Sequence, residues 1–432
     1  MPIVDRNKLT LKRELGLWEV TLAGIGIILG AGIYVLVGKA AGVTGNTVWL
    51  SFLFGALVAA FTGLSYAELS TLFPKAGAEY VYTQHAFGRK VAFLIGWAII
   101  LSGIFVAATV SIGFAGYFAG LFGGSTLITA GALLLVVTAI NWYGIKQSAR
   151  LGALFTLIEG AGLILIIFIG LPHLGSVDYL QMTHGLGGVL SAGALIFFAF
   201  LGFEEIVRLS EETKNPNRTI PRALIISIVI TTILYVLVAL VAVSVVNAET
   251  LATSSSPLAD VASVALGPEA FFILSVIALF STANTVLLEI MATSRIMYGM
   301  AEFKSLPRAF GRLSRSRRTP TIALALLFVA SAVTIAVTDI HLAAEVSDFF
   351  LFMTFLIING VAIALRYKMP GAKRRFKMPL NIGRFPVLAL LGVIATLLLL
   401  VSLNSTIVFY GFLAMIVGAL LYGCMKYGRI IQ

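Results

Sequence analysis

The sequence predicts an all-α polytopic membrane protein with twelve transmembrane helices, and three observations support that prediction. The 432-residue chain is 59% hydrophobic and only 11% charged, whereas soluble domains have about 25% charged residues. Nearly every segment between polar loops is an apolar run of about 20 residues, which is the length that crosses a bilayer. The first and sixth of these runs are interrupted. The lipid bilayer is therefore the expected main partner.

The twelve expected helices are joined by loops too short to form a folded domain. Their ranges are 17–40, 47–72, 91–119, 124–143, 151–172, 186–207, 221–246, 269–298, 320–338, 345–366, 386–404 and 406–425. The chain is therefore expected to form one membrane domain.

The positions of Lys and Arg predict the orientation of the bundle. With these helix ranges, all 30 Lys and Arg except Lys39 lie on one side of the membrane or at helix ends that face it. The opposite loops 173–185 and 247–268 contain none. Because Lys and Arg mark cytoplasmic loops, the tails 1–16 and 426–432 are expected in the cytoplasm, with the protein in the plasma membrane. A basic patch for nucleic acid would need its own soluble face, so no nucleic-acid partner is expected.

The first helix carries four glycines within nine residues, at positions 24, 26, 30 and 32. Glycine lowers helix stability, and freed backbone groups in a membrane need protein or a water-filled cavity to satisfy them. Glycines spaced by four also serve close helix packing. The sixth helix, ALIFFAFLGFEEIVRLSEE, has Gly202 in its middle and Glu204 soon after. This second interruption favours a binding site between two discontinuous helices over simple packing.

The two interrupted helices also predict an internal symmetry. They begin two halves of five helices, at 17–172 and 186–366. An odd number of spans inserts the two halves in opposite directions, which gives a 5+5 inverted repeat with discontinuous helices 1 and 6. Helices 11 and 12, at 386–425, lie outside the repeat.

The residue inventory argues against an enzyme. Cys424 is the single cysteine, so neither a disulfide within the chain nor a cysteine metal cluster is expected. The four His are scattered, and no convergent set of nucleophile, base and metal ligands is visible. There is no phosphate-binding P-loop, so ATP is not the expected energy source and no cofactor is expected.

Six motifs resemble the amino acid–polyamine–organocation transporters, which have the leucine-transporter fold. They are GAGIY at 30–34, PKAGAEYVY at 74–82, NWYGIK at 141–146, FFAFLGFEE at 197–205, EETKNPNRTIPRA at 211–223 and SRIMYGMAEFKSLP at 294–307. The resemblance implies a secondary active transporter that moves amino acids by alternating access, with proton-coupled symport expected. The alternatives are a sodium-coupled or exchange transporter of cationic amino acids or polyamines, and, in a different class, a membrane nutrient receptor that does not transport.

The resemblance also implies a set of substrate-binding residues. They are Gly30, Ala31, Gly32, Phe198, Ala199, Phe200, Leu201 and Phe203. The first three would offer backbone N–H groups, at the positive end of a half-helix, to the substrate carboxylate. Phe198, Ala199 and Leu201 would offer carbonyls to the ammonium. The other two phenylalanines are expected either as pocket walls or a gate, or as ordinary packing residues.

Glu159, in the middle of the fifth helix, is the expected coupling residue. Proton-coupled relatives have a lysine at what is the equivalent position, beside the ion site of sodium-coupled relatives, and Glu159 excludes that lysine mechanism here. A buried carboxyl can itself carry a proton. It could instead ligate a cation with Ser281, Thr282 or Thr285, or bond a neighbouring hydroxyl without any role in transport. Proton coupling is favoured over sodium, because intramembrane carboxyls are usually functional.

Glu204 is the second candidate for coupling. It follows the break in the sixth helix. It could keep a cavity hydrated, contact a cationic substrate, or pair with Arg208 one turn on. Of the other intramembrane acids, Glu68 is expected to join helices, and Glu289 receives no assigned role.

Overall fold

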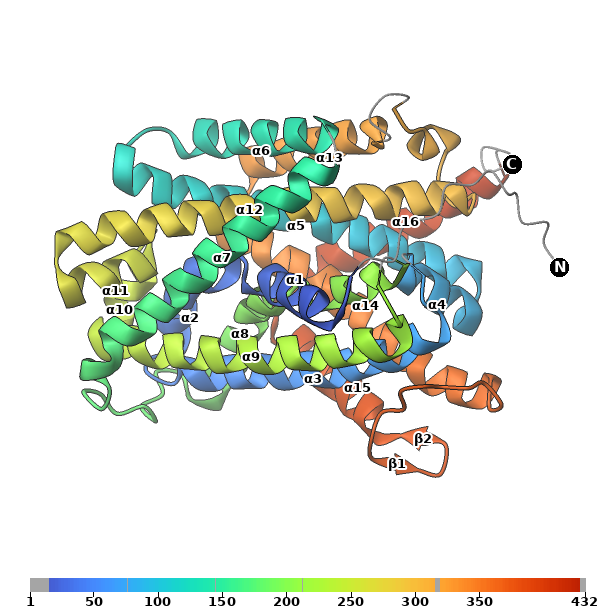
Figure 1. Cartoon of the computed structure of the whole chain (residues 1–432), viewed down its shortest axis with the longest axis horizontal. Coiled ribbons are helices and arrows are strands. Elements are labelled where there is room, and N and C mark those ends of the chain that lie inside the picture. Colours follow the sequence, from blue (N-terminus) through green and yellow to red (C-terminus); the bar gives the residue numbers. More distant parts are fainter. Residues whose placement is uncertain (1–14, 76, 144, 212, 315–318, 428–432) are drawn as a thin grey trace.

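The computed structural model describes residues 15–427 except 76, 144, 212 and 315–318, so the expected tails fall almost wholly outside it. Long helices run side by side along the longest axis, and α1, α2 and α8 lie between them (Figure 1).

The first six helices are α1 (Leu17–Leu29), α2 (Ala31–Thr44), α3 (Val48–Leu72), α4 (Ala78–Phe87), α5 (Arg89–Phe122) and α6 (Thr126–Tyr143). They are followed by α7 (Ile145–Gly170), α8 (Gly185–Ile196), α9 (Pro216–Val245), α10 (Ala248–Thr253), α11 (Pro257–Leu266) and α12 (Pro268–Glu302). The last four are α13 (Thr321–Val337), α14 (Ile340–Lys368), α15 (Val387–Ser402) and α16 (Ser405–Tyr427).

The bundle has the surface of a membrane protein. Large apolar side chains are exposed on its outside, among them Trp18 at 67%, Ile128 at 73% and Val401 at 81%. Soluble proteins rarely expose large apolar patches. In the described residues, nine helical segments are long and apolar enough to cross a membrane, or ten if the bent pair α1–α2 is one span. The predicted polytopic, mainly helical architecture is confirmed.

Two of the three shorter apolar helices in the described residues coincide with predicted spans. The helix α13 has 17 residues and α15 has 16, whereas about 20 residues cross the hydrocarbon core. The count of twelve spans depends on both, and it stays a prediction.

Several helix ends differ from the expected ranges, for local reasons. The helix α9 begins at Pro216 rather than at 221, with this proline in the first turn, where its missing N–H costs little. The helix α14 begins at Ile340 rather than at 345, because the Asp339 carboxylate caps it by accepting the Leu342 N–H at 2.9 Å.

Among the described residues, three short α-helices and one hairpin lie outside the predicted helices. The helix α4 contains much of the PKAGAEYVY motif, and α10 and α11 fill most of the loop 247–268. A two-stranded antiparallel hairpin, β1 (Asn381–Ile382) and β2 (Phe385–Pro386), projects from the bundle before α15 (Figure 1).

A buried ion cluster joins α3, α14 and the loop after α14. Both oxygens of the Glu68 carboxylate accept hydrogen bonds from Arg366, at 2.6 and 2.5 Å. Glu68 also lies 3.1 Å from the Arg374 guanidinium and accepts the Met378 N–H at 3.0 Å. Glu68 and Arg366 are buried, at 1% and 4% exposed. The structure confirms the role expected for Glu68 as a connection between helices.

We expect Glu68→Gln to destabilise the protein by about 3 kcal/mol, because it leaves a buried guanidinium without its counter-charge. The melting temperature of the detergent-purified protein measures this loss. The matched control is Glu249→Gln, which removes an exposed carboxylate on α10. Equal melting temperatures for the two variants would contradict the assigned role of Glu68.

Candidate functional site

The first interruption separates α1 from α2. The chain bends by 41° between them, around Gly30. The first N–H groups of a helix have no partner within it, and they lie at the positive end of its dipole. The start of α2, where such N–H groups are expected, lies beside the cavity described below. Ala31 is the first residue of α2, and its side chain lies outside what the structure describes.

The second interruption lies after α8. A 3-10 segment, η2 (Phe197–Phe200), continues the helix, the chain turns at 201–202, and a second 3-10 segment, η3 (Phe203–Glu211), follows. Gly202 has a φ of +104°, a conformation that favours glycine. A Cβ at Gly202 would also collide with Ile27 of α1. The turn therefore requires glycine both for its conformation and for its contact with the first interruption.

The two interruptions touch each other. A Cβ at Gly32 would collide with the backbone of Ala199. The hydroxyl of Tyr235, on α9, lies 2.5 Å from the Ile28 carbonyl oxygen and 2.9 Å from that of Ala199, and it donates its one hydrogen to this pair. Tyr235 is fully buried. One hydroxyl thus links the end of α1 to the segment η2.

A small cavity lies between the two interruptions. It measures about 30 Å³, which is room for one or two water molecules. Its walls come from α1, α2, the second interruption, α5 and α12. The lining residues are Ile27, Ile28, Gly30, Gly32, Val106, Phe198, Leu201, Gly202, Glu205, Thr285, Leu288 and Glu289. The space between the interruptions is therefore too small for an amino acid.

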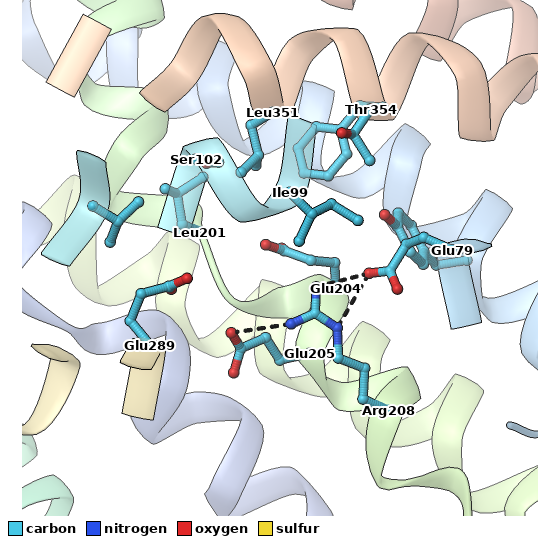
Figure 2. Close-up of a pocket in the computed structure, with 13 residues that line it drawn as sticks. Glu79, Ile99, Ser102, Leu201, Glu204, Glu205, Arg208, Glu289, Leu351 and Thr354 are labelled. Carbon is cyan, nitrogen blue, oxygen red and sulfur yellow. Dashed lines mark hydrogen bonds and ion pairs between the residues drawn. The ribbon is translucent and has the colours of Figure 1, made fainter. Parts of the chain in front are cut away.

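A second cavity adjoins the first and is rich in carboxylates. The two share Val106, Leu201, Glu205 and Glu289. Figure 2 shows Glu79, Glu204 and Glu205 gathered around Arg208. The Arg208 guanidinium lies 2.9 Å from Glu79 and 3.4 Å from Glu205. We call this space the acidic cavity.

The predicted binding residues fall into two groups. Gly30, Gly32, Phe198 and Leu201 line the cavity between the interruptions, and Ala199 lies directly behind Gly32. The structure thus brings together the segments expected to hold the two ends of an amino acid.

In this structure Phe200 and Phe203 are packing residues, which is one of the two roles expected for them. Phe200 packs against the rings of Phe52 and Tyr235, with centroids 6.4 and 5.2 Å away. Phe203 packs against Tyr66 and Phe355. Neither lines the described cavities. Both are buried packing residues here, because the 3-10 geometry turns them toward α3, α9 and α14.

The structure brings Glu159, on α7, to Ser281 on α12. The Ser281 hydroxyl donates to one carboxylate oxygen at 2.6 Å. The other oxygen, Oε2, is buried and has no hydrogen-bond partner among the described residues. Thr282 is turned away from this pair, because its hydroxyl donates to the Ala278 carbonyl of its own helix at 2.7 Å. Thr285 instead lines the cavity beside Gly30.

Of the three roles considered for Glu204, the pair with Arg208 is not among the ion pairs of the described residues. One Glu204 oxygen accepts the Gly202 N–H at 3.0 Å, so the carboxylate folds back onto the turn. Arg208 pairs with Glu79 of α4 and with Glu205.

Sequence reasoning assigned no role to four polar residues of this region. They are Tyr66, Glu79, Glu205 and Tyr235. The signal for Glu205 was its mid-span position, and the signal for Glu79 was its place in the PKAGAEYVY motif.

The family model for amino acid permeases matches residues 15–422 of the chain. The branched-chain amino acid permease BcaP of Bacillus subtilis is 29% identical, over 96% of this chain and 93% of its own. The methylthioribose transporter of the same organism is also 29% identical, over 86% of this chain and 85% of its own. Cationic amino acid transporter 4, vacuolar, of Arabidopsis thaliana is 28% identical, over 83% of this chain and 64% of its own.

We expect Tyr235→Phe to lower the free energy of unfolding by about 1–3 kcal/mol, because it removes the donor shared by two buried carbonyls. Thermal melting of the purified protein measures the change. Tyr410→Phe is the control, since Tyr410 is 61% exposed. If the two variants melt alike, the hydroxyl does not hold the interruptions together.

Proposed function

The chain belongs to the amino acid permease family, whose members are transporters and not enzymes, and on that premise we propose that it moves amino acids across the membrane by alternating access. One observation carries this proposal, namely that two interrupted helices meet around a small cavity between them. Transporters place substrate between discontinuous helices in this way.

The proposed pose uses backbone groups at both ends of the amino acid. The carboxylate would accept N–H groups at Gly30, Ala31 and Gly32, where the dipole of α2 favours an anion. The ammonium would donate to carbonyls of the segment 198–201. Two of these oxygens already accept one hydrogen bond each, Phe198 from Leu201 and Ala199 from Tyr235, and a carbonyl oxygen can accept a second.

Movement is part of the proposal, because a cavity of about 30 Å³ is too small for an amino acid. In our proposal α13 and α15 also cross the membrane, which brings the spans to twelve. The segments 17–172 and 186–366 form the inverted repeats, and a bundle of helices rocks against the remaining helices around the substrate. Residues 386–425 stay outside the repeats, and both tails face the cytoplasm. The bacterial permease among the relatives supports a plasma-membrane location.

Uptake of radiolabelled amino acids by proteoliposomes tests the function. We expect at least one amino acid to accumulate, and Gly32→Ala to abolish that uptake, because the added methyl drives the two interruptions apart. Gly131→Ala is the matched control, since a Cβ there meets nothing within 4 Å. Binding without flux would instead identify a receptor. If no amino acid or amine binds or moves, the proposal is wrong.

We propose that coupling is to protons, through Glu159. Its Oε2 is buried without a hydrogen-bond partner among the described residues, which suits a carboxyl that gains and loses a proton. The Ser281 hydroxyl, on α12, donates a hydrogen bond to the other oxygen. A change in the charge of Glu159 would therefore change a contact between α7 and α12. The same pair could ligate sodium, and the experiment separates the two ions.

We expect an inside-alkaline pH gradient to stimulate uptake in the wild type, and Glu159→Gln to lose that stimulation, because an amide cannot release a proton. Proteoliposome uptake with imposed proton or sodium gradients measures this. Unchanged dependence on the pH gradient in the variant would contradict the role of Glu159. Stimulation by sodium alone would favour sodium coupling, and a requirement for internal amino acid would favour exchange.

A further inference from the structure

The acidic cavity carries more negative than positive groups. Four carboxylates line it, those of Glu79, Glu204, Glu205 and Glu289. Among the described lining residues of both cavities, Arg208 is the one Lys or Arg. Its closest acidic partner is Glu79, whose Oε1 lies 2.9 and 3.3 Å from two guanidinium nitrogens. The single positive charge of Arg208 therefore faces four carboxylates, with Glu79 the nearest.

The other three carboxylates are compensated only in part. Glu205 lies 3.4 Å from Arg208, at the long end of hydrogen-bond distance. Glu204 accepts a backbone N–H at 3.0 Å, and Glu289 accepts the Thr293 hydroxyl at 2.9 Å. Buried carboxylates are costly unless they are paired. A second cation in this cavity would therefore stabilise these carboxylates.

Two buried oxygens that line the acidic cavity have no hydrogen-bond partner in the described part of the chain. They are the Tyr66 hydroxyl oxygen and Oε2 of Glu79. Both residues are 0% exposed. Such orphaned polar atoms are rare in native structures. Both can accept hydrogen bonds, and an ammonium group offers three donors and no acceptor.

Glu205 and Glu289 stand where the two cavities join, since both residues line each of them. In Figure 2, Glu289 lies on the side of Glu205 away from Glu79. An amino acid held by its carboxylate and ammonium between the interruptions would extend its side chain past this pair. A neutral side chain there would offer no hydrogen-bond donor to the Tyr66 hydroxyl or to Oε2 of Glu79, and it would add no positive charge beside the four carboxylates.

We propose that the transported substrate is a basic amino acid, whose side-chain cation is bound by Glu205 and Glu289 at the mouth of the acidic cavity. This inference rests on the proposed function, because it uses that pose for the two ends of the substrate. The incoming cation would share Glu205 with Arg208, whose contact is long enough to be exchanged. A site built for a charged group rejects an analogue that lacks it, because its own buried groups are then unpaired.

Lysine and norleucine form the sharpest pair of probes, since they share a carbon chain and differ in the terminal ammonium. We expect the full-length wild-type protein to bind lysine at least about tenfold more tightly than norleucine, as fits a charge-assisted contact. Calorimetry or competition binding in detergent measures both affinities. In the double variant Glu205→Gln with Glu289→Gln, the lysine-to-norleucine ratio should fall to about one. In the control variant Glu249→Gln, which alters an exposed carboxylate, the ratio should stay as in the wild type.

Equal or tighter binding of norleucine by the wild type would overturn the inference while leaving amino acid transport intact. A double variant that keeps the wild-type ratio would also overturn it. If the double variant does not fold, the ratio of lysine to norleucine affinity in the wild type tests the inference by itself. The proposed function itself falls only if neither these two nor any other amino acid binds or moves.

Discussion

Backbone groups released where two helices break inside a membrane bundle must find partners, and the rest of this structure depends on how they do so. The Tyr235 hydroxyl serves one carbonyl from each interruption, at Ile28 and Ala199. This shared donor holds the interruptions in contact, and Gly32 and Gly202 make room for that contact. The start of α2 lies beside the cavity, so we propose that the same break that destabilises the helix creates the place where an anion binds.

The buried carboxylates divide into two kinds. The Glu68 carboxylate contacts two arginines and a backbone N–H, so its charge is compensated by the contacts that join α3 to α14. The carboxylates of the acidic cavity share one arginine, and Glu159 has one hydroxyl for its two oxygens. Incomplete compensation is what a site needs if it is to gain and release protons or cations. Burial alone would not separate the structural residue from the functional ones, because both kinds are buried.

Sequence reasoning predicts features whose signal is local, and it fails for features that depend on packing between distant segments. The interruptions at Gly30 and Gly202 and the buried Glu159 are visible in the chain because glycine and charge are rare in membrane spans. The orientations of Phe200 and Phe203 follow from the 3-10 geometry of the second interruption, which hydrophobicity does not report. Tyr235 lies on α9, far along the chain from Ile28, so only the folded structure shows it between the interruptions.

A structure determined with an amino acid bound most directly tests the claim that the two interruptions form the substrate site. The substrate carboxylate is predicted at hydrogen-bond distance from the N–H groups at Gly30–Gly32, with its ammonium at the carbonyls of residues 198–201. A substrate bound elsewhere, with its ends held by side chains and the space between α2 and η2 unchanged, would contradict that claim.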